Sequence, residues 1–380
     1  EKPEICIINT CAVTNEAEKQ SRQLINKTVK NGIKTIITGC YGELKSSLWD
    51  KDKENIIFIK NNDKNNIINI LSNHFSINGL DNTEPLKKSR PIIKVQEGCD
   101  NNCTYCTIPL TRGKPRSIPI ETITDEIIYY QEKGFKEIVL TGTQLGSYGK
   151  DMIPKKNLSM LIKEILDKSH IQRIRLSSLE INDIDEELLE VISSERICKH
   201  LHLPLQSGDD YILKLMKRYY RVCDYASVIN RIIDKLPNIS IGTDIIVGFP
   251  GETDNHFKNT KKFIELMPYS YLHIFPYSKR PYTSASTFPG QVPDSIKKKR
   301  ASELRDLSKI KKNNYVKKFI NKTLCVLIED NLGDLFIGTS DNYIKVLVRG
   351  TPDLTVGMLV DAKIVSAHEM NAIGNIERIK

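Results

Sequence analysis

The stretch PIIKVQEGCDNNCTYC, residues 91–106, decides how this 380-residue chain is interpreted. Its apolar first half leads into three cysteines, Cys99, Cys103 and Cys106, spaced C-x3-C-x2-C, and no fourth cysteine or histidine lies nearby. Four protein ligands normally close a structural zinc site or an electron-transfer cluster, whereas three leave one metal position open. The three cysteines therefore indicate a reactive centre rather than a structural one.

The composition is that of an ordinary globular protein of a reducing compartment. With 39% hydrophobic and 27% charged residues, the 43.3 kDa chain can build two or three domains with buried cores. It contains no apolar stretch near the ~20 residues that a membrane span requires and no charged-then-apolar leader, so we expect a cytoplasmic protein without a membrane partner. The nine cysteines are an odd number and stand in clusters or singly, which favours metal ligation over a secreted disulfide framework.

The excess of positive charge is confined to one segment. The net charge is +9, and residues 297–322 alone carry eleven Lys or Arg against two acidic residues. Leu304, Leu307 and Ile310 recur there at helical spacing, which predicts a helix with one buried stripe and a basic outer face. A solvated helix face is the alternative, but the concentration of the whole excess in one place favours a polyanionic partner, most simply nucleic acid.

The N-terminal part predicts a small parallel α/β domain. Two short apolar runs, residues 4–9 and 33–38, flank a helix-compatible stretch at 15–30. Each run ends near a cysteine, Cys11 in Asn-Thr-Cys and Cys40 in Gly-Cys-Tyr. Because the carboxyl ends of parallel strands share one sheet edge, the two thiols are expected to meet there, an arrangement that chance also produces.

Extended and helical runs alternate in the middle of the chain. The extended runs lie near residues 92–96, 137–142, 173–178, 200–205, 239–247 and 271–277. Apolar residues recur three or four apart near residues 122–133, 158–168, 185–193, 210–217, 224–235 and 254–267. Six such units predict a parallel barrel or part of one, with reactive groups on the loops after the strands, where the three cysteines stand. From about Thr323 the pattern predicts a small antiparallel β barrel or sandwich, of a kind often used on nucleic acids.

These patterns predict an α/β protein with three domains. We expect an N-terminal α/β domain at residues 1–80, a partial (βα)6 barrel at 91–315 and the small antiparallel β barrel at 316–380. Residues 76–89 are polar without a clear period, which places a linker at 81–90.

Polar or glycine-rich loops follow five of the predicted strands. They span residues 141–149, 175–180, 202–208, 244–252 and 273–280. Glycines permit close backbone approach to a ligand, and the hydroxyl and carboxylate groups suit an ammonium or a ribose. A turn and a helix cap explain any single loop, but five such loops on one barrel face indicate a ligand.

The segment Cys99-Asp-Asn-Asn-Cys103-Thr-Tyr105-Cys106 resembles the C-x3-C-x-aromatic-C signature of radical S-adenosylmethionine (SAM) enzymes. The motifs Asn-Thr-Cys and Gly-Cys precede this segment, and the terminal barrel, called TRAM in the family, follows it. With its domains in this order, the whole chain is similar to the methylthiotransferases. The resemblance implies a [4Fe-4S] cluster on Cys99, Cys103 and Cys106 whose free iron chelates SAM and cleaves it to a 5'-deoxyadenosyl radical. It also implies an auxiliary [4Fe-4S] cluster in the N-terminal domain.

Three motifs resemble the family branch that acts on N6-threonylcarbamoyladenosine in tRNA. They are residues 9–14 (Asn-Thr-Cys-Ala-Val-Thr), 141–149 and 273–280. The resemblance implies transfer of a methylthio group to carbon 2 of this nucleoside at tRNA position 37, with one SAM donating the methyl group and another the radical. The alternatives are N6-isopentenyladenosine, whose branch has Ile-Arg after Asn-Thr-Cys-x and Gln-Asn in the barrel loop, and an aspartate of a ribosomal protein. Gln144 matches the isopentenyladenosine loop only in part.

The resemblance also implies cofactor contacts and partners. Tyr105 is expected to pack beside SAM, and Gly142, Gln144, Ser178 and Glu180 are expected to make polar contacts with it, a structural role being the alternative for each. The expected partners are tRNA, an electron donor of the flavodoxin or ferredoxin type, and a sulfur source. No catalytic residue is assigned beyond the cluster ligands.

The auxiliary cluster departs from the family pattern. The family holds it with three cysteines, of which this chain shows Cys11 and Cys40. The first ligand lies upstream of Asn-Thr-Cys in the family, and the chain begins at Glu1, ten residues before Cys11, so we expect a trimmed N-terminus. Cys6, on the apolar run itself, is a poor substitute.

A rival interpretation is a metal-containing nucleic-acid-binding protein, or a redox carrier, without catalysis. It predicts a fourth protein ligand to the three-cysteine cluster and no SAM site. The resemblance over essentially all 380 residues favours the enzyme.

Overall fold

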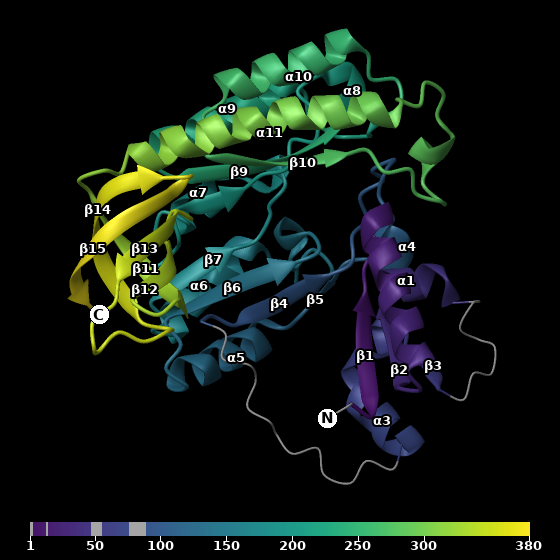
Figure 1. The fold of residues 1–380 in the computed structure, drawn as a ribbon, viewed down its shortest axis with the longest axis horizontal. Coiled ribbons are helices and arrows are strands. Elements are labelled where there is room, and N and C mark those ends of the chain that lie inside the picture. The colour runs from purple at the N-terminus through teal and green to yellow at the C-terminus, as the bar shows by residue number, and fades with distance from the viewer. Residues whose placement is uncertain (1–2, 13, 47–54, 76–88) are drawn as a thin grey trace. The chain divides into compact units, whose positions relative to one another are not determined.

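The structure is a computed structural model that describes residues 3–12, 14–46, 55–75 and 89–380, and its elements are labelled in Figure 1. The chain divides into two units. The N-terminal unit consists of residues 1–85, 98–114 and 278–288, and the barrel unit consists of residues 86–97, 115–277 and 289–380. The predicted linker at 81–90 lies outside the described residues, except for its last two.

A three-stranded parallel sheet forms the centre of the N-terminal unit; its first two strands and the helix between them were predicted, and the third strand was not. Its elements are β1 (Ile5–Thr10), α1 (Asn15–Lys30), β2 (Lys34–Gly39) and β3 (Ile56–Phe58), with the strands in the order β1-β2-β3. The unit also contains α2 (Cys40–Leu44), η2 (Asn61–Asn66), α3 (Ile67–Phe75), α4 (Ile108–Arg112) and η5 (Ser284–Thr287). Ile8, Ile25 and Ile37 form a buried cluster that removes apolar surface from water. Helix α1 begins at Thr14, whose hydroxyl accepts a hydrogen bond from the N–H of Ala17, a typical N-cap.

Two later segments of the chain belong to the N-terminal unit and are tied into it by hydrogen bonds. The buried side chain of Asn61 donates to the carbonyl of Thr111 over 2.8 Å. The N–H of Ala285 donates to the carbonyl of Thr104, also over 2.8 Å. The cysteine-bearing segment 98–114 is therefore held on both sides by residues distant in sequence.

Six parallel strands follow one another in chain order in the barrel unit, which confirms the predicted partial barrel. They are β4 (Ile92–Glu97), β6 (Glu137–Gly142), β7 (Arg173–Leu176), β8 (His200–His202), β9 (Ser240–Val247) and β10 (Tyr271–Pro276). The short strand β5 (Arg116–Ser117) pairs with β4, and a bridge between Ile174 and Ile197 joins the sheet of β4, β6 and β7 to the sheet of β8, β9 and β10. The predicted helices are α5 (Ile120–Glu132), α6 (Leu158–Lys168), α7 (Glu186–Val191), α8 (Asp210–Leu215), α9 (Val222–Lys235) and α10 (Asp254–Leu266).

Strand β8 ends at His202, three residues earlier than predicted. Pro204 has no N–H to donate to the ladder, and Gln206 has a φ of +69°, outside the extended region. The chain still follows β9, because the N–H of Leu203 donates to the carbonyl of Gly242 over 2.9 Å. The strand is therefore shorter than predicted, and its last residue, His202, is also the first residue of the predicted polar loop 202–208.

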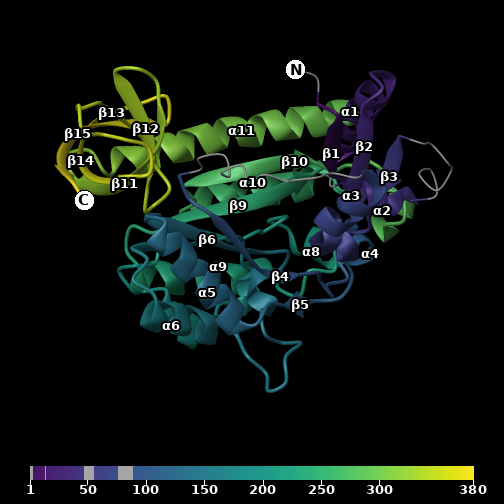
Figure 2. The same ribbon diagram turned by 90° about the horizontal axis from the view of Figure 1, so that it is seen from below.

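Helix α11 (Asp294–Lys317) follows the last strand of the sheet and lies along β10 (Figure 2). Leu304 is fully buried, as predicted, but Ile310 is 58% exposed, so the predicted stripe is wrong at its end. The inward face continues instead through Ser308, one turn after Leu304. The hydroxyl of Ser308 accepts a hydrogen bond from the N–H of Leu272 over 2.9 Å. A polar contact between Ser308 and β10 therefore replaces the apolar contact that the sequence pattern assigned to Ile310.

Two basic side chains of α11 are buried rather than on its outer face. Lys297 is 8% and Arg300 is 4% exposed, and Arg300 forms ion pairs with Glu252 (2.6 Å) and Asp254 (2.7 Å). The prediction of a uniformly solvated basic face is therefore wrong for these two residues. The exposed basic residues of the helix are Lys298, Lys299, Arg305, Lys309 and Lys317.

Five strands close a small barrel near the C-terminus, as predicted. They are β11 (Thr323–Asn331), β12 (Leu335–Ser340), β13 (Lys345–Arg349), β14 (Leu359–His368) and β15 (Asn371–Ile379), in the order β11-β12-β13-β15-β14. All pairs are antiparallel except β13 with β15. Val326, Ile328, Val346 and Val360 fill its core, and closure leaves no strand edge unpaired.

Glu137, the first residue of β6, is a fully buried carboxylate among three arginines. Its oxygens lie 2.8 Å from Nη1 of Arg90, 2.7 Å from Nη2 of Arg173 and 2.9 Å from Nε of Arg175. Burial raises the pKa of Glu137, but the three arginines outweigh burial and hold the pKa below its usual value. The carboxylate is therefore ionised and balanced by positive charge.

The same arginines join the parallel strands to the C-terminal barrel. Arg173 and Arg175 donate hydrogen bonds of 3.0–3.2 Å to the backbone carbonyls of Cys325, Thr339, Ser340 and Asp341. Arg90 also pairs with Glu329 of β11. Glu137 thus sets the orientation of the guanidinium groups that connect the two parts of the barrel unit.

Replacing Glu137 by alanine is expected to lower the free energy of unfolding of the barrel unit by about 3–5 kcal/mol, because it leaves buried arginines without their counter-ion. Urea unfolding, monitored by circular dichroism, measures this loss of unfolding free energy. Glu303→Ala, which removes one partner of an exposed pair with Lys261, is the control and should change little. Equal effects of the two substitutions would contradict a structural role for the Glu137 cluster.

Candidate cluster and cofactor site

The three cysteines of the candidate cluster site lie on one loop between β4 and α4, in the N-terminal unit. The side chains of all three cysteines are partly exposed. The N–H of Asn101 donates to Sγ of Cys99 and the N–H of Ile108 to Sγ of Cys106, each over 3.4 Å. Backbone N–H groups aimed at sulfur favour thiolates, which are the form that binds iron.

The ends of this loop are closed by glycines. Gly98 has a φ of +85°, and a Cβ at this position would lie 2.1 Å from the carbonyl oxygen of Lys114. Next to it, the N–H of Cys99 donates to the carbonyl of Gly113 over 3.0 Å. Any larger residue at position 98 would force the ends of the loop apart. The local sequence therefore presents three thiols from a closed loop, a donor set that fits a cluster with one iron left open.

Cys11 and Cys40 follow two neighbouring parallel strands at the same sheet edge, as predicted. The register pairs Thr10 with Gly39, the residues directly before the two cysteines. Gly39 has a φ of +96°, and a Cβ there would lie 2.2 Å from the carbonyl oxygen of Thr10, so only glycine allows this approach. Cys11 is exposed and Cys40 is buried. Cys6 lies within β1, about 16 Å along the strand from Cys11, which argues against it as a ligand at this edge.

Segment 278–288 is fastened to the same unit by a buried arginine. Arg280 is 3% exposed and donates to Oδ1 of Asn15 and to Oε2 of Glu18, both over 2.6 Å. The N–H of Asn15 donates to Oγ of Ser278 over 3.1 Å. The part of the predicted loop 273–280 that contains Arg280 thus belongs with helix α1, which begins shortly after Cys11.

Two of the expected SAM contacts lie together after β6. The N–H of Gln144 donates to Oε1 of Gln96 over 2.9 Å, and a Cβ added to Gly142 would lie 3.0 Å from the same oxygen. Both residues are partly exposed. The side chain of Gln96 therefore orders the backbone of this loop, and the absence of a side chain at Gly142 makes room for it.

The remaining expected contacts follow the next strand or stand on the cysteine loop. Ser178 is exposed after β7, and Glu180 is partly exposed and paired with Arg218. Tyr105 is partly exposed between Cys103 and Cys106, in the N-terminal unit. The structure thus brings Gly142 and Gln144 together, and gives Glu180 a partner that the sequence analysis had not considered.

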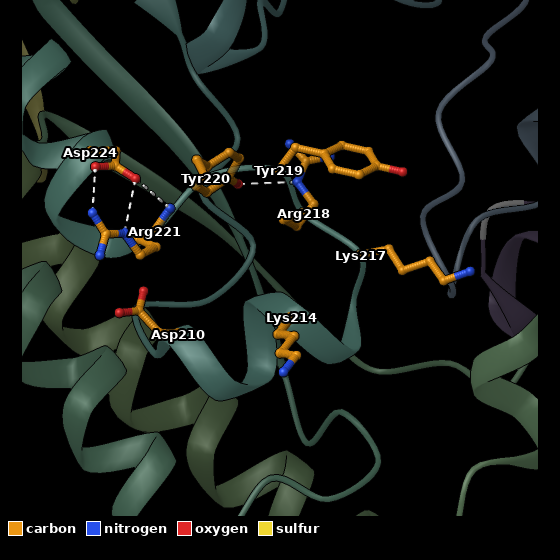
Figure 3. Close-up of a pocket in the computed structure, with 8 residues that line it drawn as sticks. All are labelled: Asp210, Lys214, Lys217, Arg218, Tyr219, Tyr220, Arg221 and Asp224. Atoms are coloured by element: carbon orange, nitrogen blue, oxygen red, sulfur yellow. Dashed lines mark hydrogen bonds and ion pairs between the residues drawn. The ribbon is translucent and has the colours of Figure 1, made fainter.

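Arg218 belongs to a basic segment that the sequence analysis missed, residues 214–221, which comprises the end of α8 and the turn before α9; we call it the basic loop. The loop borders an open pocket of about 670 Å³ lined by Asp210, Lys214, Lys217, Arg218, Tyr219, Tyr220, Arg221 and Asp224 (Figure 3). Arg218 donates to Oη of Tyr220 over 3.1 Å, and Arg221 pairs with Asp224. Lys214 and Lys217 make no ion pair within the described part of the chain, and Tyr219 is 68% exposed. The available signal was the density of basic and tyrosine residues in Lys-Leu-Met-Lys-Arg-Tyr-Tyr-Arg.

Two family models match the chain. Residues 93–264 match the model described as the Radical SAM superfamily, and residues 1–59 match the model described as Uncharacterized protein family UPF0004. No helix among the described residues is long and apolar enough to span a membrane.

Curated relatives cover nearly the whole chain. The threonylcarbamoyladenosine tRNA methylthiotransferase MtaB of Aquifex aeolicus is 38% identical over 377 residues, covering 94% of this chain and 90% of that protein. The protein of the same name from Bacillus subtilis is 34% identical, covering 96% and 86%. The tRNA-2-methylthio-N(6)-dimethylallyladenosine synthase of Clostridium tetani is 36% identical over a shorter 282 residues, covering 73% and 62%.

A solved structure shares the fold. The radical S-adenosylmethionine methyltransferase TsrM from Kitasatospora setae superposes with a TM-score of 0.58 at 12% identity, covering 75% of this chain and 65% of that chain. At that identity the likeness concerns the fold alone. The sequence relatives carry the family assignment: the chain belongs to the radical SAM methylthiotransferases of the MtaB family.

Proposed function

We propose that this chain transfers a methylthio group to carbon 2 of N6-threonylcarbamoyladenosine at position 37 of tRNA. The carrying observation is the closed loop with three partly exposed thiols, in a chain 33–39% identical to five proteins named for this reaction. Family membership implies SAM and a [4Fe-4S] cluster. The carbon that reacts carries a hydrogen without acidic character, which explains why radical chemistry is required.

In this proposal Cys99, Cys103 and Cys106 hold the SAM-binding cluster. When bound, the cluster and SAM supply a radical able to remove hydrogen from an unreactive carbon. Tyr105 packs beside SAM, and polar groups after β6 and β7 contact it, namely Gly142, Gln144, Ser178 and Glu180. The pairing of Glu180 with Arg218 supports this role, because it fixes the carboxylate in one position.

Cys11 and Cys40 supply two ligands of an auxiliary [4Fe-4S] cluster in this proposal. Their position after two paired parallel strands supports it, because both thiols lie at one edge of the sheet. The cluster carries the sulfur that becomes part of the methylthio group. A flavodoxin- or ferredoxin-type donor supplies electrons, and a separate sulfur source renews the sulfur.

The tRNA contacts the C-terminal barrel, the exposed basic face of α11 and the basic loop. Lys298, Lys299 and Arg305 remain exposed on α11 although Lys297 and Arg300 are buried. In the basic loop, Lys214 and Lys217 are available to phosphates and the exposed Tyr219 offers a ring for stacking (Figure 3).

The substrate is tested by nucleoside analysis of tRNA from a strain that lacks the gene. We expect the methylthio group to vanish from N6-threonylcarbamoyladenosine and to remain on isopentenyladenosine. The intact gene and Cys223→Ala, a change at an exposed cysteine of α9, should restore it, whereas Cys103→Ala should not. Loss from isopentenyladenosine instead would assign the chain to the other tRNA branch.

Charge reversal tests the basic loop. The double variant Lys214→Glu, Lys217→Glu is expected to bind tRNA more weakly and to reduce the slope of log affinity against log salt by about 1 for each lost phosphate contact. Filter binding from low to moderate salt measures both quantities. Lys168→Glu, at an exposed lysine of α6, is the matched control. An unchanged salt slope in the double variant would remove this loop from the tRNA site.

A further inference from the structure

Two histidines and an aspartate lie side by side on three neighbouring strands of the barrel unit. They are His202 on β8, Asp244 on the central strand β9 and His273 on β10. Oδ1 of Asp244 lies 3.0 Å from Nε2 of His202 and 3.3 Å from Nδ1 of His273. One ligand atom from each residue lies within 4.8 Å of the other two. The family assignment and the SAM site leave this group without a role.

The side chains around His202 hold its ring in one orientation. Nδ1 of His202 is hydrogen-bonded to Oη of Tyr271 over 3.1 Å, and Tyr271 is also bonded to Nε2 of His200 over 2.8 Å. Tyr343 stacks on His200 with ring centroids 4.2 Å apart, and its ring centroid also lies 5.5 Å from that of Tyr271. Gly242 makes this packing possible, because a Cβ there would lie 2.1 Å from the Tyr271 ring. A histidine whose second nitrogen is fixed in this way is typical of metal ligands, because the bond directs the other nitrogen at the metal.

The separations between these atoms match those between ligands of one metal ion. Metal–ligand bonds of about 2.0–2.2 Å place neighbouring ligand atoms about 3 Å apart in an octahedral site and about 3.4 Å apart in a tetrahedral one. The two distances to Asp244, 3.0 and 3.3 Å, lie at these values. The third pair of atoms, on His202 and His273, is separated by no more than 4.8 Å, and the half-exposed ring of His273 can move to close it.

The charge and exposure of the group also suit a cation. Asp244 places a carboxylate between the two imidazoles, with Oδ1 facing a ring nitrogen of each. The side chains of His202, Asp244 and His273 are 9%, 24% and 53% exposed, so solvent reaches the group from the His273 side. Three protein ligands with one accessible side leave coordination positions for water or another oxygen donor.

We propose that His202, Asp244 and His273 bind one divalent first-row transition-metal ion, such as zinc, separate from the iron–sulfur clusters. First-row transition-metal ions bind well to two imidazoles and one carboxylate, whereas Mg²⁺ and Ca²⁺ prefer oxygen ligands. On binding, each imidazole turns a nitrogen lone pair toward the ion and carries its proton on the other ring nitrogen, which for His202 is the Nδ1 that is bonded to Tyr271. The accessible side of the ion takes water or an oxygen donor of a bound substrate. The site does not depend on the proposed substrate.

The test is zinc binding by the full chain with its clusters reconstituted, so that the cluster cysteines are already occupied. The protein is incubated anaerobically with zinc, desalted and examined for metal content and for X-ray absorption at the zinc edge, which iron does not contribute to. We expect about one zinc per chain, with nitrogen and oxygen neighbours at about 2.0–2.1 Å and no sulfur near 2.3 Å. Asp244→Asn and His273→Gln should lose this zinc, and His170→Gln, at an exposed loop histidine, should keep it.

Iron content and circular dichroism of each variant verify that loss of zinc does not reflect misfolding. His273→Gln serves this purpose best, because the side chain is largely exposed. Absence of retained zinc in the unsubstituted chain, a sulfur shell around it, or undiminished zinc in both variants would overturn the proposal. The three residues would then form a hydrogen-bonded group only. None of these readouts uses methylthiotransferase activity, so this site and the proposed function can fail separately.

Discussion

The function of this protein depends on holding three thiols in fixed positions on eight residues of loop. A loop of this length has no core of its own, so its geometry must come from its ends and from its neighbours. Gly98 and Gly113 close the ends, and Asn61 and Ala285 hold the flanks through Thr111 and Thr104. Asn61 and Ala285 lie 50 and 181 positions away from the residues they contact, so the loop is shaped by the fold as well as by its own glycines.

A second constraint operates in the barrel unit, where a cluster of buried charges adds to the apolar core. Glu137 forms ion pairs with three arginines, and two of these donate hydrogen bonds to the backbone of the C-terminal barrel. Buried ion pairs of this kind contribute little net stability relative to apolar packing, but breaking one is costly, so they specify a single arrangement. The small barrel that the proposal assigns to tRNA is thereby held in register with the parallel strands.

Much of the fold was accessible from the sequence, because apolar periodicity distinguishes helix from strand wherever one face is buried. The six strands and six helices of the partial barrel were predicted in this way, as was the small terminal barrel. Prediction was less successful where a polar partner distant in sequence decides burial. Arg300 is buried because it forms ion pairs with Glu252 and Asp254. Ser308 rather than Ile310 faces β10 because its hydroxyl accepts a hydrogen bond from a backbone N–H of that strand.

The same reason separates the predicted from the unpredicted parts of the sites. The cysteines were recognisable because three cysteines at such close spacing are typical ligands of an iron–sulfur cluster. Glu180 with Arg218, and His202 with Asp244 and His273, are polar residues on different strands and loops, and only strand register brings them together. The sequence had assigned Glu180 a contact with SAM and had placed His202, Asp244 and His273 in polar loops, but it gave no sign of these pairings.

The central claim is that the Cys99, Cys103 and Cys106 cluster has an open iron that binds SAM. The most direct measurement is electron paramagnetic resonance of the reconstituted, reduced chain carrying Cys11→Ala and Cys40→Ala, so that only this cluster remains. The account predicts a [4Fe-4S] signal whose g-values shift when SAM is added. A signal that SAM leaves unchanged would contradict it and would favour a cluster closed by a fourth protein ligand.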